Sequence, residues 1–200
     1  MLSKNKHTID VILASNSPRR RELLHQIGIQ FKVCPTQTDE RVLTNEKPET
    51  YVVRVASDKV AVASQSVKKG IVIAADTIVV IDNAILGKPV DKRDAERMIS
   101  TLQGKIHQVM TGLAVMSAGS KKMLTGLSIT KVWFRALAET DIHSYVETGE
   151  PLDKAGAYGI QGIGALLVDK IEGCYFNVVG LPISLLGEML RSFDIDLLQR

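Results

Sequence analysis

Residues 11–21 read Val11-Ile12-Leu13-Ala14-Ser15-Asn16-Ser17-Pro18-Arg19-Arg20-Arg21. The apolar run predicts a strand, and the residues after it predict the start of a helix, because Ser17 is a suitable N-cap and Pro18 fits the first helical turn. An apolar helix face follows and Gly28 marks its end. A helix N-terminus with Ser15, Ser17 and up to three guanidinium groups predicts a phosphate-binding site; a solvated basic helix start is the alternative.

Strand-like and helix-like patterns alternate through the rest of the chain, which favours a layered α/β fold. Expected strands cover 31–34, 71–75, 78–81, 109–116 and 128–134, and expected helices cover 48–67, 91–103, 141–148 and 182–193. Residues 149–164 read as a glycine-rich loop, and residues 165–179 as a hairpin that turns at Glu172-Gly173. The strand pattern at 71–81 is interrupted by Asp76-Thr77.

Composition restricts the possible functions. The chain has 200 residues, is 45% hydrophobic, and carries 25 basic and 22 acidic residues for a net charge of +3. This balance gives no global field for non-specific binding of nucleic acid or a membrane surface, so any anion site must be local. Two distant cysteines, Cys34 and Cys174, form no disulfide framework or metal motif. With no run of signal-peptide or membrane-span length, we expect a cytoplasmic protein.

Four polar features carry possible chemistry. Asp76 follows five apolar residues, which favours a carboxylate held in a cleft over a solvated strand end. Asp39-Glu40 lies in a polar loop and is either solvated or part of a metal site. Lys88 sits in the rigid turn Gly87-Lys88-Pro89, although turn lysines are most often only exposed. Residues 150–162 combine several charges with three glycines, which is typical of a binding loop.

Taken together, these motifs resemble those of the Maf family of nucleoside triphosphate pyrophosphatases over residues 10–193, with the first nine residues as a polar N-terminal extension of a single domain, 1–200. The motifs are the 13–24 pattern, Ala75-Asp76-Thr77, Gly87-Lys88-Pro89, and residues 149–162 from Gly149 to Gly162. The resemblance implies a two-lobed, mixed-sheet α/β fold like that of the inosine triphosphate pyrophosphatases, with the active site in the central cleft. It also implies a homodimer.

The same resemblance implies roles for individual residues. Asp76 matches the proton acceptor, and Glu40 an acid that, with Asp76, helps to hold Mg²⁺ or Mn²⁺; a divalent cation is physically needed between a triphosphate and facing carboxylates. Positions around the triphosphate are matched by Ser15, Arg20, Lys59 and Lys88. The lysines and Arg20 would take up charge on the leaving pyrophosphate. Whether Asp76 acts as base, as metal ligand or as both stays open.

Three positions distinguish the branches of this family, and here they are Arg19, Thr77 and Gln161. A neutral Gln161 offers one acceptor and two donors, which match the acceptor–donor edge of uracil or thymine, whereas guanine suits a carboxylate. The set resembles the dTTP/UTP branch rather than the sister branch that acts on 7-methyl-GTP. We therefore expect cleavage of pyrimidine nucleoside triphosphates to the monophosphate and pyrophosphate.

Two other classes of function remain open. One is regulation of septum formation through protein partners, an activity that the family name implies but for which this chain encodes no evident surface. The other is nucleic-acid binding through the arginines at 19–21, which the near-neutral charge and the few aromatic residues disfavour.

Overall fold

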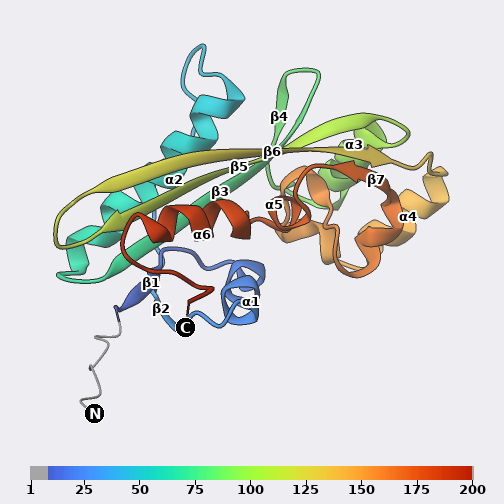
Figure 1. The fold of residues 1–200 in the computed structure, drawn as a ribbon. Helices are drawn as coiled ribbons and strands as arrows, with labels where there is room; N and C mark the ends of the chain where they lie inside the picture. The colour runs from blue at the N-terminus through green and yellow to red at the C-terminus, as the bar shows by residue number, and fades with distance from the viewer. Residues whose placement is uncertain (1–8, 200) are drawn as a thin grey trace.

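A computed structural model describes residues 9–199, which form one mixed sheet with helices on both faces (Figure 1). Seven strands make the sheet: β1 (Val11–Leu13), β2 (Phe31–Val33), β3 (Ile71–Ile81), β4 (Ala84–Leu86), β5 (Ile106–Ser117), β6 (Met123–Phe134) and β7 (Val168–Glu172). The main helices are α1 (Pro18–Gln26), α2 (Pro48–Ser66), α3 (Lys92–Leu102), α4 (Glu139–Glu147), α5 (Tyr175–Val179) and α6 (Ile183–Arg191). Except at Ile9, the predicted N-terminal extension lies outside the described residues.

The order of the strands places a switch point at β1. The sheet runs β2-β1-β3-β5-β6-β7, with β2, β1 and β3 parallel and the later strands antiparallel. The chain therefore leaves β1 in one direction through α1 and returns in the other through α2. Right-handed crossovers then require these helices to lie on opposite faces. A crevice forms outside the carboxyl ends of strands at such a point, and this is where ligands bind in open α/β sheets.

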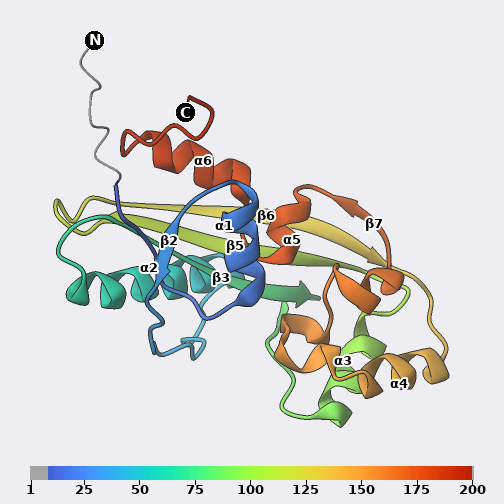
Figure 2. The ribbon, with the colours of Figure 1, turned by 90° about the horizontal axis from the view of Figure 1, so that it is seen from below.

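Burial follows this layering. Leu23 and Leu24 of α1 pack with α6 on one face, while Val52 and Val60 of α2 pack on the other. Figure 2 shows the sheet with α6 on one side and α2 on the other. The start of α1 agrees with the sequence prediction, because the Ser17 side chain accepts a hydrogen bond from the Arg20 backbone N–H at 3.4 Å. This cap satisfies one of the backbone N–H groups that the first helical turn leaves without an intrahelical partner.

Strand β3 links the two halves of the molecule. Only its first part pairs with β1, whose last residue is opposite Ile73, and its second part continues beside β4 and β5. The predicted interruption at Asp76-Thr77 is wrong, because pairing with β5 is continuous through both residues. Since side chains alternate along a strand, Asp76 faces the side of α2 and Thr77 faces the side of α1. Both lie just past the end of β1.

The second half of the molecule covers the far end of the sheet. Helices α3 and α4 pack there with three short 3-10 helices, η1 (Glu150–Asp153), η2 (Ala155–Ala157) and η3 (Gly162–Leu167). His107 anchors the predicted glycine-rich loop, because its Nε2 lies 2.7 Å from the Tyr158 hydroxyl. Burial lowers the pKa of His107 to about 4, so this imidazole is neutral at physiological pH.

The predicted hairpin at 165–179 is wrong. Only β7 is a strand, and it pairs with β6 before Gly173 turns the chain into helix α5. Asn177 is fully buried and donates its side-chain N–H groups to the Val109 carbonyl at 3.0 Å and the Thr130 hydroxyl at 2.9 Å. These contacts to distant strands stabilise α5, and they cannot be predicted from the sequence pattern around Asn177.

Strand β4 was not predicted, and the segment expected as a glycine-rich loop contains η1, η2 and η3. The other helices and strands agree in type with the predictions, and their ends differ by a few residues, as is usual for helix and strand ends. Within residues 9–199, no helix has both the length and the apolar character needed to cross a membrane.

Candidate active site

A cleft of about 540 Å³ lies at the switch point, between the two halves of the molecule. Its walls come from the start of α1, the loop after β2, α2, the middle of β3, the turn after β4 and the glycine-rich segment. All of the site residues predicted from the sequence line it: Ser15, Ser17, Arg19, Arg20, Glu40, Lys59, Asp76, Thr77, Lys88 and Gln161. The fold therefore brings the separate motifs to one place.

Arg20 joins α1 to the opposite wall of the cleft. Its Nε donates to the Gly180 carbonyl at 2.8 Å, and its two terminal nitrogens donate to the hydroxyls of Ser15 and Thr77, each at 3.1 Å. Desolvation lowers the pKa of Arg20 and neighbouring Asp76 opposes this, yet a guanidinium stays charged. Because a guanidinium has five N–H donors, about two remain for a ligand.

Ser15 and Thr77 keep defined capacities for hydrogen bonding. The Ser15 oxygen accepts from Arg20 and from the Ser17 backbone N–H at 3.2 Å, which leaves its own proton free to donate to an anion. Thr77 and Thr111 hydroxyls lie 2.9 Å apart, and Thr111 donates to the Asn177 carbonyl at 3.1 Å. Thr77 must then donate to Thr111, so towards a ligand it can act only as an acceptor.

A lysine bridges two carboxylates on the other side of β3. Lys59 Nζ lies 2.7 Å from Asp76 Oδ1 and 2.9 Å from Glu40 Oε1. The side chains of Lys59 and Asp76 are each 11% exposed, whereas that of Glu40 is 53% exposed. Asp39 is not part of this group, because its carboxylate is paired with Arg41 at 2.6 Å and does not line the cleft.

The donor set allows a divalent cation to be held together with a ligand. In the part of the chain that the structure describes, no group of three or more His, Cys, Asp or Glu side chains is placed to hold a metal alone. Glu40 and Asp76 supply two carboxylates at the cleft. Mg²⁺ is commonly bound by one or two carboxylates together with substrate phosphates, so this pair fits such an ion.

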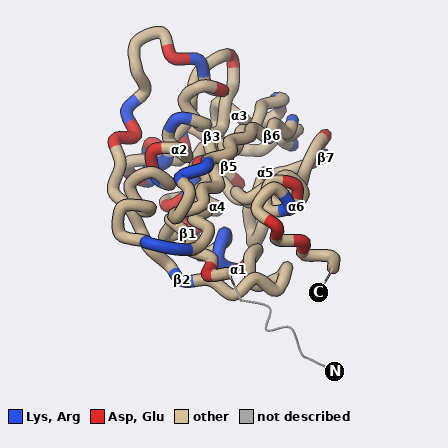
Figure 3. Tube along the Cα trace, turned by 60° about the vertical axis from the view of Figure 1, so that its left-hand side comes forward, with Lys and Arg blue, Asp and Glu red and all other residues tan. Residues whose placement is uncertain are grey.

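The remaining predicted residues come from three segments: Arg19 from α1, Lys88 from the turn after β4 and Gln161 from the glycine-rich segment. Arg19 pairs with Asp153 at 3.0 Å, which links α1 to the glycine-rich segment. Lys88 is exposed and Gln161 is half-buried, and neither side chain has a hydrogen bond or ion pair with the described residues 9–199. Both are therefore available to a ligand. In the view of Figure 3, basic and acidic residues are interspersed along the chain. An anion in the cleft would therefore be attracted by the basic side chains that line the cleft rather than by a large basic surface.

Comparison with known proteins agrees with this geometry. A family model described as "Maf-like protein" matches residues 10–193. The chain belongs to the Maf family. A relative from Clostridioides difficile named "dTTP/UTP pyrophosphatase" is 46% identical, with 94% of this chain and 98% of that protein covered. A relative of the same name from Thermoanaerobacter sp. (strain X514) is 48% identical, with 94% and 99% covered.

Solved structures place the Maf-like chain in a wider fold group. The Staphylococcus aureus Ham1 protein has a TM-score of 0.52 and 14% identity, and the match covers 92% of this chain and 99% of that protein. At this identity the likeness concerns the fold alone. The expected mixed-sheet α/β fold with a central cleft is confirmed.

Sequence reasoning did not single out several residues that shape the site of this Maf-like protein. Lys154 lines the cleft and donates to the Glu150 carbonyl and to Asp153 at 2.5 and 2.7 Å. The Glu150 carboxylate accepts from the backbone N–H groups of Ile163 and Gly164, each at 2.9 Å, and so fixes the glycine-rich segment. The charges of Lys154 and Glu150 within a glycine-rich motif indicate a binding loop, but the groups with which these two side chains pair can be seen only in the fold.

Proposed function

We propose that this Maf family member hydrolyses dTTP and UTP to the nucleoside monophosphate and pyrophosphate. One observation carries the proposal: the Asp76–Lys59–Glu40 group and the N-terminus of α1 with Arg20 line one cleft. A nucleoside triphosphate has both the anionic chain that such cations bind and the phosphorus centres at which a carboxylate can assist attack by water. The names of the relatives support the same class of substrate.

The chain's own groups divide the work. Phosphate oxygens are bound by the Ser15 proton, by the free N–H groups of Arg20 and by the N-terminus of α1. Lys88 binds the triphosphate from the turn after β4. Asp76 accepts the proton of the water that attacks the α-phosphorus. Lys59, Arg20 and Lys88 stabilise the charge that develops on pyrophosphate. A divalent cation held by Glu40, Asp76 and the phosphates would screen the repulsion between carboxylates and substrate.

We propose that Gln161 is the main residue that recognises the nucleobase of the substrate. Its amide is half-buried in the cleft and can present an acceptor and a donor to the edge of uracil or thymine. Thr77 contributes an acceptor only, because its proton is used by Thr111. Arg19 contributes to this recognition through its ion pair with Asp153, which links α1 to the glycine-rich segment that carries Gln161.

Gln161→Glu should lower kcat/KM for dTTP and UTP by about tenfold or more. The substitution replaces a donor by an acceptor and leaves a pyrimidine carbonyl facing a carboxylate oxygen, which costs about 1–3 kcal/mol. GTP and 7-methyl-GTP should lose less or gain. The measurement is kcat/KM for all four nucleotides with both proteins, and Gln26→Glu, at the exposed end of α1, is the matched control.

Equal losses for all four nucleotides would contradict this role. Gln161 would then only support the glycine-rich segment, and specificity would rest on Arg19 and Thr77.

Hydrolysis of CTP or modified pyrimidine nucleotides, a role in maintaining the nucleotide pool, a homodimer and a cytoplasmic location stay predictions. Regulation of septum formation through partners is not favoured, since the relatives' names describe pyrophosphatases.

A nucleotide panel tests the proposal. dTTP, UTP, CTP, dATP and GTP are each incubated with Mg²⁺, with Mn²⁺ and with chelator, and pyrophosphate is resolved from orthophosphate. We expect pyrophosphate from dTTP and UTP only when a divalent cation is present. Equal turnover of purine and pyrimidine nucleotides would contradict the assigned specificity, and undiminished turnover in chelator would contradict the metal requirement.

A further inference from the structure

The loop between β2 and α2, residues 35–47, carries Glu40 to the cleft but has little apolar anchoring. Val42 and Leu43 are 51% and 55% exposed, and neither belongs to a buried apolar cluster. A loop that buries so little apolar surface gains little from the hydrophobic effect and must be ordered by other contacts. We call residues 35–47 the Glu40 loop.

Arg54 of α2 supplies most of those contacts. Its guanidinium donates to both carboxylate oxygens of Glu46, at 2.6 and 2.9 Å, and to the Arg41 carbonyl at 3.0 Å. The Glu46 side chain is only 5% exposed, and it also accepts the Leu43 backbone N–H at 3.0 Å. The hydrogen bond from Arg54 lowers the pKa of Glu46, which keeps that carboxyl ionised. A planar fork is suited to holding a carboxylate and a carbonyl at once.

Tyr51 holds the same loop at the residue that enters the site. Its hydroxyl donates to the Glu40 carbonyl at 2.8 Å. Burial raises the pKa of Tyr51 to about 12, so the donor proton is retained at physiological pH. Tyr51 and Arg54 are three residues apart and therefore share a helix face, and the Arg54 guanidinium carbon lies 5.5 Å from the centre of the Tyr51 ring.

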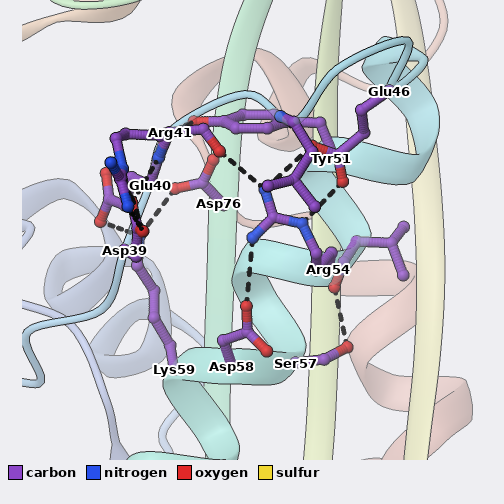
Figure 4. A network of polar contacts seen from close by, with 12 residues as sticks. Asp39, Glu40, Arg41, Glu46, Tyr51, Arg54, Ser57, Asp58, Lys59 and Asp76 are labelled. Atoms are coloured by element: carbon purple, nitrogen blue, oxygen red, sulfur yellow. Dashed lines mark hydrogen bonds and ion pairs between the residues drawn. The ribbon is translucent and has the colours of Figure 1, made fainter.

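Helix α2 therefore holds both the Glu40 loop and Lys59, the residue with which the Glu40 carboxylate pairs. Lys59 lies farther along α2 and meets the Glu40 carboxylate, while Tyr51 and Arg54 donate to the consecutive backbone carbonyls of Glu40 and Arg41 (Figure 4). With Glu40 half-exposed, its position depends on this polar frame rather than on packing.

We propose that Arg54, assisted by Tyr51, is a positioning residue that holds the Glu40 carboxylate beside Asp76. The inference rests on the proposed function, because it takes Glu40 to act on the triphosphate site. Arg54 itself does not line the cleft and acts only through the loop. A merely structural role would instead make Arg54 important for folding and indifferent to Glu40.

The test is a double-mutant cycle between Arg54→Lys and Glu40→Gln, measured as kcat/KM for dTTP. Lysine keeps the charge but cannot hold Glu46 and the Arg41 carbonyl together, so Arg54→Lys should cost on the order of tenfold in the wild-type background. In the Glu40→Gln background the same change should cost less than about twofold, since residues that act as a unit are not additive. Tyr51→Phe should behave in the same way with a smaller loss.

Asp58→Asn is the matched control. Asp58 accepts from Arg54 at 3.2 Å on the side away from the loop and does not line the cleft, so its loss should leave kcat/KM within about twofold. Hydrogen exchange gives a second readout: in Arg54→Lys, backbone amides of residues 39–46 should exchange faster while those of β3 keep their protection.

Equal losses from Arg54→Lys in both backgrounds, or unchanged exchange in the Glu40 loop, would overturn the proposal. Full activity of Glu40→Gln would overturn it as well, because Arg54 would then have nothing to position. Turnover of dTTP by the wild-type protein is measured in the same series, so a failure of the proposed function is seen separately as absence of that turnover.

Discussion

Asp76→Asn should lower kcat for dTTP by more than about a hundredfold without unfolding the protein. The change removes the proton acceptor and one negative charge at the cleft, while the amide has nearly the same shape. Asp76 is buried and lies 2.7 Å from Lys59, so the change also leaves Glu40 as the one carboxylate paired with that ammonium among residues 9–199. The measurement is steady-state kcat and KM, with circular dichroism and thermal melting to show that the fold is intact.

Asp82→Asn is the matched control for this change. Asp82 is exposed in the turn after β3 and has a φ of 49°, a conformation that asparagine tolerates well. It should retain normal activity. A folded Asp76→Asn protein with near-normal kcat would show that the catalytic centre lies elsewhere.

Lys88→Ala should lower kcat/KM for dTTP by about a hundredfold, because removal of one group that stabilises charge in a transition state typically has an effect of this size. Lys88 lines the cleft and has no ion pair within residues 9–199, so its charge is available to the triphosphate. Lys88→Arg should recover part of the loss. The same kinetic assay, repeated at several dTTP concentrations, separates binding from turnover.

Lys92→Ala provides the control for net charge. Lys92 is 50% exposed, pairs with Glu147 and does not line the cleft, so its removal lowers the protein's charge equally but should leave kcat/KM unchanged. Matching losses in the two variants would mean that Lys88 acts through the general field of the protein rather than on the phosphates.

Local chemistry made the first part of the fold predictable from the sequence. Ser17 and Pro18 set the start of α1, apolar spacing predicted α2, and the Asp91 N-cap with Gly104 predicted α3, because caps and periodicity act within a few residues. The segment 165–179 was predicted wrongly because Asn177 is stabilised by groups on β5 and β6. Tertiary contacts there outweigh the hairpin signal of Gly173.

For the site, too, the residues could be predicted from the sequence but their tertiary contacts could not. Its residues could be listed from the motifs and the family resemblance, and the cleft brings that list together. The pairings could not be predicted, because Lys59 and Asp76 are 17 positions apart and Arg20 and Gly180 are 160 apart. The contacts of Arg54 with Glu46 and Arg41 could not be predicted either, since a basic residue on a helix gives no sign that it binds a neighbouring loop.

If Asp76 accepts the proton of the attacking water, that water adds to the α-phosphorus of dTTP. Hydrolysis in ¹⁸O-labelled water, followed by mass spectrometry of both products, shows which phosphorus is attacked. We predict that the label enters dTMP and that pyrophosphate is unlabelled. Label in pyrophosphate, or stepwise release of orthophosphate through dTDP, would contradict the account.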